Sequence, residues 1–381
     1  MNAALINDRR MWNTFVAAAP NGHLCQTWEW AENSGESTGA GSLRVGVLDD
    51  AGGLVAAMLL VRSVASGMRA PFYYAPRGPI CASPESPALP VLLDFAKREA
   101  RKRGGFFIRI EPNVPDGDTA WLARLKRLGF IPTDHVIYLR SAWVTDLRPD
   151  EDRLLSGMMT TWRQNIRAGG RKGLTVRPGA GEADLDAFYR LLVETGARDQ
   201  FHVYPKDLYR DMLRNYSSDA ATRDATAQMS LLLAEVEGQA VAAATIATFG
   251  RGSWNLHSGS SGIPEHRKLR PNYLLQWECM RLAKAQGADY YDWRTIPDIL
   301  EPGQELYGVY EFKRGFGGEV RRVIPTHDLP LNPLLYWPYV KMVSLRRAQQ
   351  RRARATFERK RLAATKPATP AGTPPATPQQ H

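Results

Sequence analysis

One lysine of this chain has neighbours that would fix its direction and limit its hydration. Lys313 stands in the segment GVYEFKRGFGGEV (308–320), between Phe312 and Phe316 and just before a glycine-rich turn. Flanking aromatic rings take water away from an ammonium group, and a desolvated lysine is a frequent functional group. We therefore take Lys313 as a candidate for a positioned, partly desolvated cation.

Two further segments combine cations with a backbone suited to a ligand. In YAPRGPI (74–80), two prolines stiffen the chain around Arg77, and Gly78 would let a ligand approach closely. A rigid turn on a sheet explains the same pattern. In HSGSSGIPEHRKLRPNYLLQWE (257–278), a loop of small residues precedes a helix that opens at residues 271–273, and helix N-termini favour anions.

The segment TTWRQNIRAGGRKG (160–173) predicts a helix with one cationic face. Its basic residues recur at helical spacing or lie beside that face: Arg163, Arg167, Arg171 and Lys172. Such a face holds phosphates or is simply solvated.

Motifs for several common mechanisms are absent from the sequence. There is no HExxH, no GxxxxGK[ST] and no GxSxG, and the seven histidines are dispersed without metal-ligand spacing. No GxGxxG follows a predicted strand, and the RxxGxG/A pyrophosphate loop of acetyl-CoA-dependent N-acetyltransferases is missing. Two classes remain: an enzyme that acts by positioning its substrates, without metal or cofactor, and a binding protein.

The elements that must hold these residues occur twice along the chain. Two β-hairpins with glycine-containing turns are predicted over 42–64 and 227–249. Each is followed by a helix that stops at a glycine and by an aromatic strand, over 92–110 and 274–293. We interpret this order as a duplicated mixed α/β unit with a boundary near 143–150. The second half also has two N-terminal helices, over 160–173 and 182–199.

Length and composition favour a multidomain protein of the cytoplasm. The chain has 381 residues, typical of two or three domains, and its three cysteines are scattered without a CxxC pair. The N-terminus lacks the layout of a signal peptide, and no apolar run approaches the ~20 residues that cross a bilayer.

Most of the net charge of +11 lies near the C-terminus. Residues 341–366 hold ten Lys and Arg but a single acidic residue. Three aromatic residues precede this basic arm: Tyr336, Trp337 and Tyr339. Such an arm attracts anionic lipid or RNA phosphates, although a solvated helical tail is the plainer interpretation. Residues 367–381, rich in Pro and Thr and without Asp, Glu, Lys or Arg, predict disorder.

Seven segments, taken in order, resemble the Fem-type (FemABX) peptidoglycan bridge-forming transferases, which use aminoacyl-tRNA to build interpeptide branches. The matching segments are QTWEWAE (26–32), YAPRGPI (74–80), FIRIEP (107–112), TTWRQNIRAGGRKGLTV (160–176), HSGSSGIPEHRKLRPNYLLQWE (257–278), GADYYDWRTIP (287–297) and GVYEFKRGFGGE (308–319). The resemblance extends over nearly the whole body of the chain, residues 25–337.

This resemblance implies an α/β fold of two tandem acetyltransferase-like (GNAT-type) domains with a cleft between them. The first domain would comprise residues 1–143, with about 328–345 returning to pack on it, and the second 144–327. Residues 346–366 would form a basic C-terminal helix and residues 367–381 a disordered tail.

The resemblance also implies site residues, position by position. Lys313 matches the family lysine held near the reacting ester and would be catalytic. Substrate-binding positions would be Tyr74, Arg77, Arg198, His202, Tyr204, His257, Asn272, Tyr273 and Phe312. Arg198 and Arg77 would bind the diphosphate of the cell-wall precursor through paired N–H groups. Candidates for contact with tRNA phosphates are Arg163, Arg167, Arg171, Lys172 and Arg314.

Three positions depart from the family pattern. His202 and His257 stand where family members often have tyrosine, and WAENSGES lacks the lysine that often follows the QxxxW element.

The implied reaction is aminolysis of an ester, in which an amine of the stem peptide attacks aminoacyl-tRNA. Lys313 would stabilise the oxyanion or the departing ribose oxygen. The implied partners are aminoacyl-tRNA as co-substrate, a lipid-linked or UDP-linked muropeptide precursor, and an anionic membrane at the inner face of the plasma membrane. Two alternatives stay open: an acyl-CoA-dependent N-acyltransferase on the same fold, and a non-enzymatic basic protein that docks on membrane or RNA.

Overall fold

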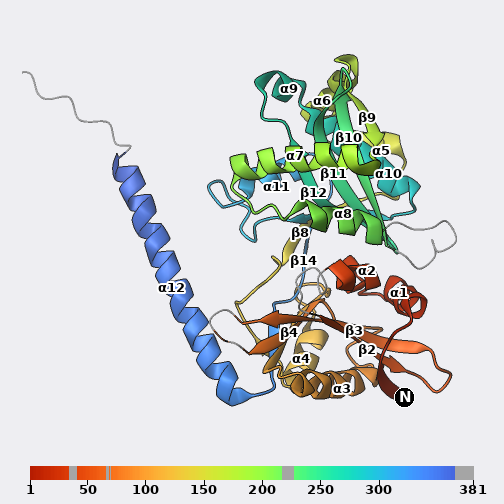
Figure 1. Ribbon diagram of the computed structural model, residues 1–381, viewed down its shortest axis with the longest axis vertical. Coiled ribbons are helices and arrows are strands. Elements are labelled where there is room, and N and C mark those ends of the chain that lie inside the picture. The colour runs from red at the N-terminus through yellow and green to blue at the C-terminus, as the bar shows by residue number, and fades with distance from the viewer. Residues whose placement is uncertain (34–40, 66–67, 69, 217–226, 365–381) are drawn as a thin grey trace, which may run out of the picture. The chain divides into compact units, whose positions relative to one another are not determined.

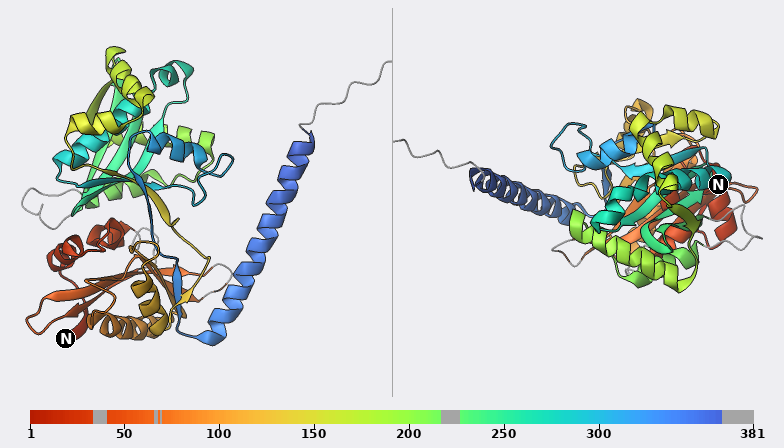
Figure 2. Two further views of the ribbon diagram at one scale, coloured as in Figure 1. Left: turned by 180° about the vertical axis from the view of Figure 1, so that it is seen from behind. Right: turned by 90° about the horizontal axis from the view of Figure 1, so that it is seen from above.

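The computed structural model describes residues 1–33, 41–65, 68, 70–216 and 227–364, with side chains as far as residue 349 (Figures 1 and 2). The chain divides into a body, residues 1–331, and a C-terminal unit, residues 332–381. Each of the two is described by itself below.

The first sheet of the body combines N-terminal strands with one strand from late in the sequence. Its order is β1-β2-β3-β4-β6-β15-β7, and β5 pairs with β3. The strands are β1 (Asn2–Leu5), β2 (Ser42–Leu48), β3 (Leu54–Val64), β4 (Pro71–Arg77), β5 (Ile80–Cys81), β6 (Phe107–Pro112), β7 (Ile131–Pro132) and β15 (His327–Pro330).

The second sheet has the order β14-β8-β13-β12-β11-β10-β9. Its strands are β8 (Ser141–Asp146), β9 (Thr175–Pro178), β10 (Gln228–Val236), β11 (Gln239–Phe249), β12 (Gly252–Ser260), β13 (Tyr290–Thr295) and β14 (Glu319–Arg322). The helices of the body are α1 (Arg9–Ala18), the 3₁₀ turn η1 (Leu24–Gln26), α2 (Trp28–Ala31), α3 (Ala88–Lys102), α4 (Thr119–Arg127), α5 (Glu151–Gly157), α6 (Thr160–Arg171), α7 (Gly181–Asp199), α8 (Lys206–Asn215), α9 (Pro264–Leu269), α10 (Pro271–Ala285) and α11 (Tyr307–Arg314).

The duplicated order predicted from the sequence is confirmed. The hairpins β2–β3 and β10–β11 are each followed by a third antiparallel strand, β4 and β12. A helix then leads to a strand that runs parallel to that third strand: α3 leads to β6 beside β4, and α10 leads to β13 beside β12. Both helices stop before a glycine with positive φ, Gly104 and Gly287, as expected for helix C-termini.

Alternation along the hairpin of the second sheet builds two cores on opposite faces. Leu231 and Leu233 of β10 face α7 and α8, whereas Leu232 and Ala234 face α10, α6 and α5. Figure 1 shows α7 running across the front of this sheet. The site elements β12, β13 and α10 are therefore fixed by buried packing on both sides.

A further core belongs to both sheets. Trp12, Val16 and Leu24, from the N-terminal segment, pack with Leu59 of β3 and with Trp254 of β12. All five side chains are fully or almost fully buried. The N-terminal segment thus fills the space between the two sheets.

The chain changes sheet twice. It leaves the first sheet after β7 and enters the second at Ser141, so the expected division at 143/144 falls inside β8. It returns with β15, which pairs with both β6 and β7. Residues 323–326 connect β14 to β15, so four residues join the two sheets here.

The C-terminal unit contains one long helix, α12 (Pro333–Ala364), with Pro338 inside it. The helix begins 13 residues before the predicted arm at 346 and runs continuously into it. The tail predicted for 367–381 lies outside the described residues.

A buried ion pair holds the returning strand. Arg109 of β6 donates from Nε and Nη2 to the two carboxylate oxygens of Asp328 in β15, at 2.7 Å each. Their side chains are 5% and 0% exposed. A bidentate pair of this kind is strong, but either partner alone would be a buried, unmatched charge.

We expect Asp328→Ala to lower the free energy of unfolding by about 3–5 kcal/mol, because the Arg109 guanidinium would stay buried without its partner. Urea unfolding measures this. The control is Glu85→Ala, which removes the exposed partner of Arg127 and should cost at most ~1 kcal/mol. Equal losses in the two variants would contradict the assignment.

Candidate active site

Lys313 lies on α11 with its ammonium group held against the end of β13. Its Nζ donates to the carbonyl of Thr295 at 2.7 Å. Burial, opposed by the charge of Asp292 and aided by that of Arg294, lowers the pKa of Lys313 to about 7. The desolvation expected from its aromatic neighbours is therefore present, and the lysine changes charge near neutral pH.

The glycine-rich turn after Lys313 is locked by tight packing. A Cβ at Gly315 would come within 2.2 Å of the Trp162 ring, and the indole of Trp162 donates to the Phe312 carbonyl at 3.0 Å. The Gly317 carbonyl accepts from Trp143 Nε1 at 3.0 Å and from Thr145 Oγ1 at 2.7 Å. Glycine is required at 315 because α6 presses on the backbone there.

Beside Lys313, the end of β13 carries a bulge. The pairing of β13 with β8 shifts register between Asp292 and Thr295, and Arg294 within it has a φ of 61°. Asp292 Oδ1 accepts from the Arg294 amide at 2.6 Å and holds this turn. Burial raises the pKa of Asp292, and the Arg294 amide with the charges of Arg294, Arg77 and Lys313 opposes that rise.

Four of the predicted binding residues share one cavity of about 290 Å³ at the N-terminus of α10. This arginine cavity is lined by Arg198, Ser260, Ser261, Arg267, Arg270, Pro271, Asn272, Tyr273 and Phe312. The Asn272 Oδ1 atom is buried without a hydrogen-bond partner. Arg198 donates to the Ser260 carbonyl at 3.3 Å and pairs with Asp199. Three guanidinium groups beside a helix N-terminus make this cavity suited to an anion.

Two other predicted residues, Tyr204 and His257, line a second cavity of about 340 Å³. This aromatic cavity is lined by Trp30, Asn33, Tyr138, Tyr204, Leu208, Met212, Tyr216, Leu256, His257 and Arg294. Burial lowers the pKa of His257 to about 3, with Arg294 adding to the effect, so the imidazole is neutral. His202 is exposed and packs edge-on against the Tyr204 ring, with 4.9 Å between centroids.

Tyr74 and Arg77 are not among the residues that line either cavity. The Tyr74 hydroxyl donates to Glu111 at 2.5 Å, and Arg77 donates to the Leu139 carbonyl at 3.1 Å. The prediction that Gly78 leaves room for a ligand is wrong. A Cβ at this position would lie 2.9 Å from the side-chain amide nitrogen of Gln26. The close approach at this turn is made by a side chain of the protein itself.

The prediction that the small residues at 257–260 form a loop is wrong. They form the end of β12. A Cβ at Gly259 would lie 2.6 Å from the backbone of α7 at Leu191 and Leu192. The strand is small here so that the helix carrying Arg198 can pack close to it.

The cationic face of α6 is divided in its roles. Arg163 donates to the carbonyls of Ser156 and Met158 at 2.8 Å each and so caps the end of α5. Arg167, Arg171 and Lys172 are exposed. On α11, Arg314 is exposed and lies near Glu311, 3.5 Å away.

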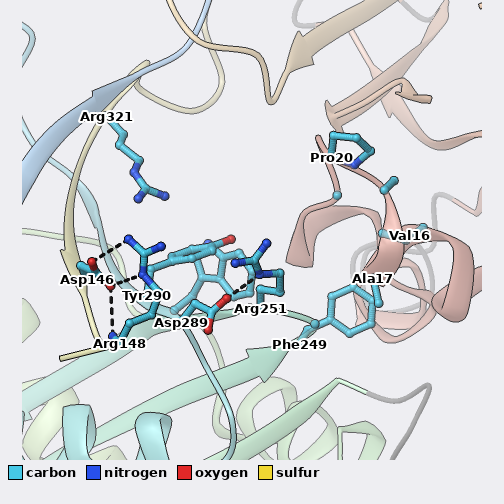
Figure 3. A pocket seen from close by; sticks show the side chains of 14 residues that line it. Val16, Ala17, Pro20, Asp146, Arg148, Phe249, Arg251, Asp289, Tyr290 and Arg321 are labelled. Atoms are coloured by element: carbon cyan, nitrogen blue, oxygen red, sulfur yellow. Dashed lines mark hydrogen bonds and ion pairs between the residues drawn. The ribbon is translucent and has the colours of Figure 1, made fainter. Parts of the chain in front are cut away.

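A third cavity, of about 270 Å³, contains none of the predicted residues (Figure 3). Its charged residues include Arg148, paired with Asp146, and Arg251, paired with Asp289. Both arginines are largely exposed and have carboxylate partners, so we assign no function to this cavity.

Sequence reasoning missed Arg294, Asp292, Trp30 and Tyr138. The signal for the first two was available: an Asp-x-Arg pair interrupts the aromatic strand YYDWRT. Trp30 and Tyr138 gave no signal, because only the fold brings them to the same cavity as His257.

Within the described residues, no helix is long and apolar enough to span a membrane. The described part of the chain also contains no group of three or more His, Cys, Asp or Glu side chains that could hold a metal ion.

The family model described as "FemAB family" matches residues 8–118, 130–240 and 223–342. The chain belongs to the FemAB family. This membership confirms the resemblance drawn from the ordered segments of the sequence.

Similar proteins extend the FemAB assignment. Lipid II:glycine glycyltransferase of Staphylococcus aureus (strain USA300) is 26% identical over 392 residues, which cover 85% of this chain and 92% of the relative. The protein of the same name from strain MRSA252 gives the same identity and coverage. The crystal structure of FemX matches with a TM-score of 0.80 at 22% identity, over 89% of this chain and 100% of that one. The structural similarity to FemX confirms the predicted tandem fold.

For this FemAB protein we expect Lys313→Met to stabilise the fold below pH 7. The pKa of Lys313 is about 7 when folded and close to its ordinary 10.5 when unfolded. Below pH 7 the lysine is charged in both states, so the folded state bears the whole penalty of a buried charge. Between pH 7 and 10.5 only the unfolded state keeps the proton, and the penalty fades as pH rises.

Thermal unfolding at pH 6 and pH 9 measures the effect. The Tm advantage of Lys313→Met over the native protein should be larger at pH 6. The exposed Lys126, changed to Met, is the control and should show no such difference. A Met variant less stable than the native protein at pH 6 would refute the electrostatic account.

Proposed function

We propose that this protein transfers an amino acid from aminoacyl-tRNA to the stem peptide of a peptidoglycan precursor, forming an interpeptide bridge. FemAB membership and the similarity to a protein named lipid II:glycine glycyltransferase support this reaction class. The observation that carries the proposal is Lys313, a partly buried ammonium group held at the Thr295 carbonyl.

Lys313 has the donors that acyl transfer requires. One N–H bonds to Thr295, which leaves two for the oxyanion that forms when an amine attacks an ester carbonyl. The acceptor nitrogen bonds to the carbonyl carbon, the bond from that carbon to the ribose oxygen breaks, and the amine proton ends on the ribose oxygen. With a pKa of about 7, the Lys313 ammonium group can donate a proton to that oxygen near neutral pH.

The ester itself supplies the driving force, because aminolysis of an ester to an amide runs downhill without ATP. The task of the protein is then to hold two large anions and to align amine with ester, and alignment supplies up to ~7–11 kcal/mol in ideal cases. We propose no cofactor beyond the tRNA co-substrate.

We propose that the arginine cavity holds phosphate groups. Arg198, Arg267 and Arg270 converge there on the N-terminus of α10, and Phe312 of the same cavity immediately precedes Lys313. Arg198 keeps its assignment to the precursor diphosphate. Arg77, proposed for the same diphosphate, does not line this cavity, and its Nη1 is buried without a hydrogen-bond partner.

For tRNA contact we propose the exposed cations of α6 and α11: Arg167, Arg171, Lys172 and Arg314. Their attraction to RNA would weaken with salt. Arg163 contributes less, since its guanidinium already caps α5.

The decisive assay combines the full-length protein with a mixture of charged tRNAs and with lipid-linked or UDP-linked precursor, followed by mass spectrometry of the product. We expect Lys313→Ala to reduce transfer at least 100-fold, the scale of losing one oxyanion donor. Lys126→Ala, an exposed lysine on α4, should transfer at the native rate. Near-native transfer by Lys313→Ala would remove the lysine from the mechanism.

The same assay separates the alternatives. Transfer of a labelled acetyl group from acetyl-CoA, without transfer from tRNA, would establish the acyl-CoA reaction instead. A protein that transfers from neither donor but binds vesicles or RNA would be the non-enzymatic docking protein.

We also propose that α12 places the enzyme at the anionic inner face of the plasma membrane. Leu334, Trp337, Lys341 and Leu345 follow one another at helical spacing, and the three apolar side chains are 86%, 54% and 57% exposed. The basic arm 341–366 follows, and each cation near an anionic surface contributes about 1 kcal/mol. Apolar residues beside cations are typical of helices that lie in a membrane interface.

Co-sedimentation with neutral and anionic vesicles tests this placement. The full-length protein should bind anionic vesicles, and both the 1–344 truncation and the full-length Trp337→Ser variant should bind them more weakly. A tRNA gel shift runs alongside. Equal vesicle binding by all three proteins would reject the membrane role, and loss of the tRNA shift alone in the truncation would assign the arm to RNA.

A further inference from the structure

Arg294 is the single charged residue among the ten that line the aromatic cavity in the described part of the chain. The one other titratable nitrogen base there, His257, is neutral because its pKa is about 3. The remaining lining residues are aromatic or aliphatic, apart from Asn33. A lone guanidinium in an apolar wall is unusual, because burying a charge is costly unless it is paired.

The backbone is distorted at this residue. Arg294 lies in the β13 bulge with a φ of 61°, a left-handed conformation that is unfavourable for a bulky residue. Bulges redirect side chains, and this one releases Arg294 from the ladder to line the cavity. The Asp292 carboxylate supports the turn by accepting from the Arg294 amide, and its charge also attracts the Arg294 guanidinium.

Within the described residues the guanidinium group makes no direct ion pair with a carboxylate, although the charge of Asp292 attracts it. It lies 5.5 Å from the centre of the Tyr138 ring, and no Asp or Glu carboxylate of the described chain is within 4.0 Å of it. Glu111, the other buried carboxylate nearby, is fully engaged by Tyr74, Ile137 and Tyr138. By contrast, the buried Arg109 has a bidentate partner in Asp328. The guanidinium group hydrogen-bonds to the side chain of Tyr138, and its remaining donors are available to a ligand.

We propose that Arg294 binds a carboxylate of the acceptor peptide inside the aromatic cavity. This inference rests on the proposed transfer reaction and names the group by which the acceptor is recognised. A planar carboxylate accepts two parallel hydrogen bonds from one guanidinium, and the aromatic walls suit the apolar parts of a peptide. Phosphates are better served by the arginine cavity, where three guanidinium groups converge.

The position of Arg294 links recognition to chemistry. The next residue, Thr295, supplies the carbonyl that holds Lys313 Nζ. The charge of Arg294 lowers the pKa of Lys313, so a peptide anchored by a carboxylate at Arg294 would be held near the candidate catalytic lysine. Anchoring there restricts where the acceptor amine can lie relative to the ester.

The test uses acceptor peptides that share one amine and differ in which free carboxylate is converted to a carboxamide. For the native enzyme, one such conversion should raise KM by about 10-fold to 100-fold, as expected for a lost charge-assisted hydrogen-bond pair. For Arg294→Gln, the unmodified peptide should already show that weaker binding, and the same conversion should have little further effect. Conversions of other carboxylates should affect the native enzyme and the variant equally.

Binding of peptide alone, measured by isothermal titration calorimetry, gives a readout that does not depend on tRNA or on transfer. Arg294→Lys keeps a cation and should retain part of the preference for the carboxylate. If Arg294→Gln folds poorly, this second variant still tests whether the preference depends on the charge. Native enzyme that binds and uses every carboxamide peptide with the same KM would overturn the inference. An absence of transfer to any peptide, with the carboxylate preference intact in binding, would overturn the proposed reaction but not the site.

Discussion

The arrangement of the body depends on one buried ion pair, that of Arg109 with Asp328. It fixes β15 between β6 and β7, so that a strand made after the whole second sheet completes the first. Only residues 323–326 separate β15 from β14, and they are bonded along their length: Val323 exchanges hydrogen bonds with Arg140, and the Ile324 amide donates to the Val114 carbonyl. The distance between the two sheets is therefore set at this point by a few residues in fixed positions.

The same link bears on the candidate site. Lys313 and its glycine-rich turn come immediately before β14, and that turn is bonded to β8 through Trp143 and Thr145. Lys313 is thus held from one side by the second sheet and from the other by Thr295 of β13. Because the pKa of Lys313 is about 7, its charged form lowers the stability of the folded state. The rigid frame around the lysine keeps it buried despite this cost.

How far the sequence could predict this structure depends on how local each signal is. The hairpin strands 42–48 and 54–64 match β2 and β3 at both ends, because apolar runs and a glycine-containing turn are adjacent in the chain. Lys313 was identified because its aromatic neighbours are also its neighbours in sequence. The strand β15 has only four residues, and its partner Arg109 lies 219 residues away, so no local pattern marks it.

The candidate site was predictable in its parts but not in its grouping. No sequence pattern indicates that Arg198 and Asn272 line one cavity while His257 lines another. The Asp-x-Arg pair of YYDWRT marks Arg294 in the sequence, but its left-handed backbone and its place in the aromatic cavity are properties of the folded chain. Gly78 was predicted to leave space for a ligand, but the side chain of Gln26 occupies that space.

The late position of β15 has a consequence for synthesis on the ribosome. The first sheet contains the earliest residues of the chain, yet its β6 edge stays unpaired until residues 327–330 have emerged. Throughout translation of the second sheet, the buried guanidinium of Arg109 and an open strand edge await their partners, and such edges invite pairing with other chains. The first sheet is therefore completed only after the second, and a chain that ended between residues 322 and 327 would contain every strand of the second sheet but lack β15 of the first.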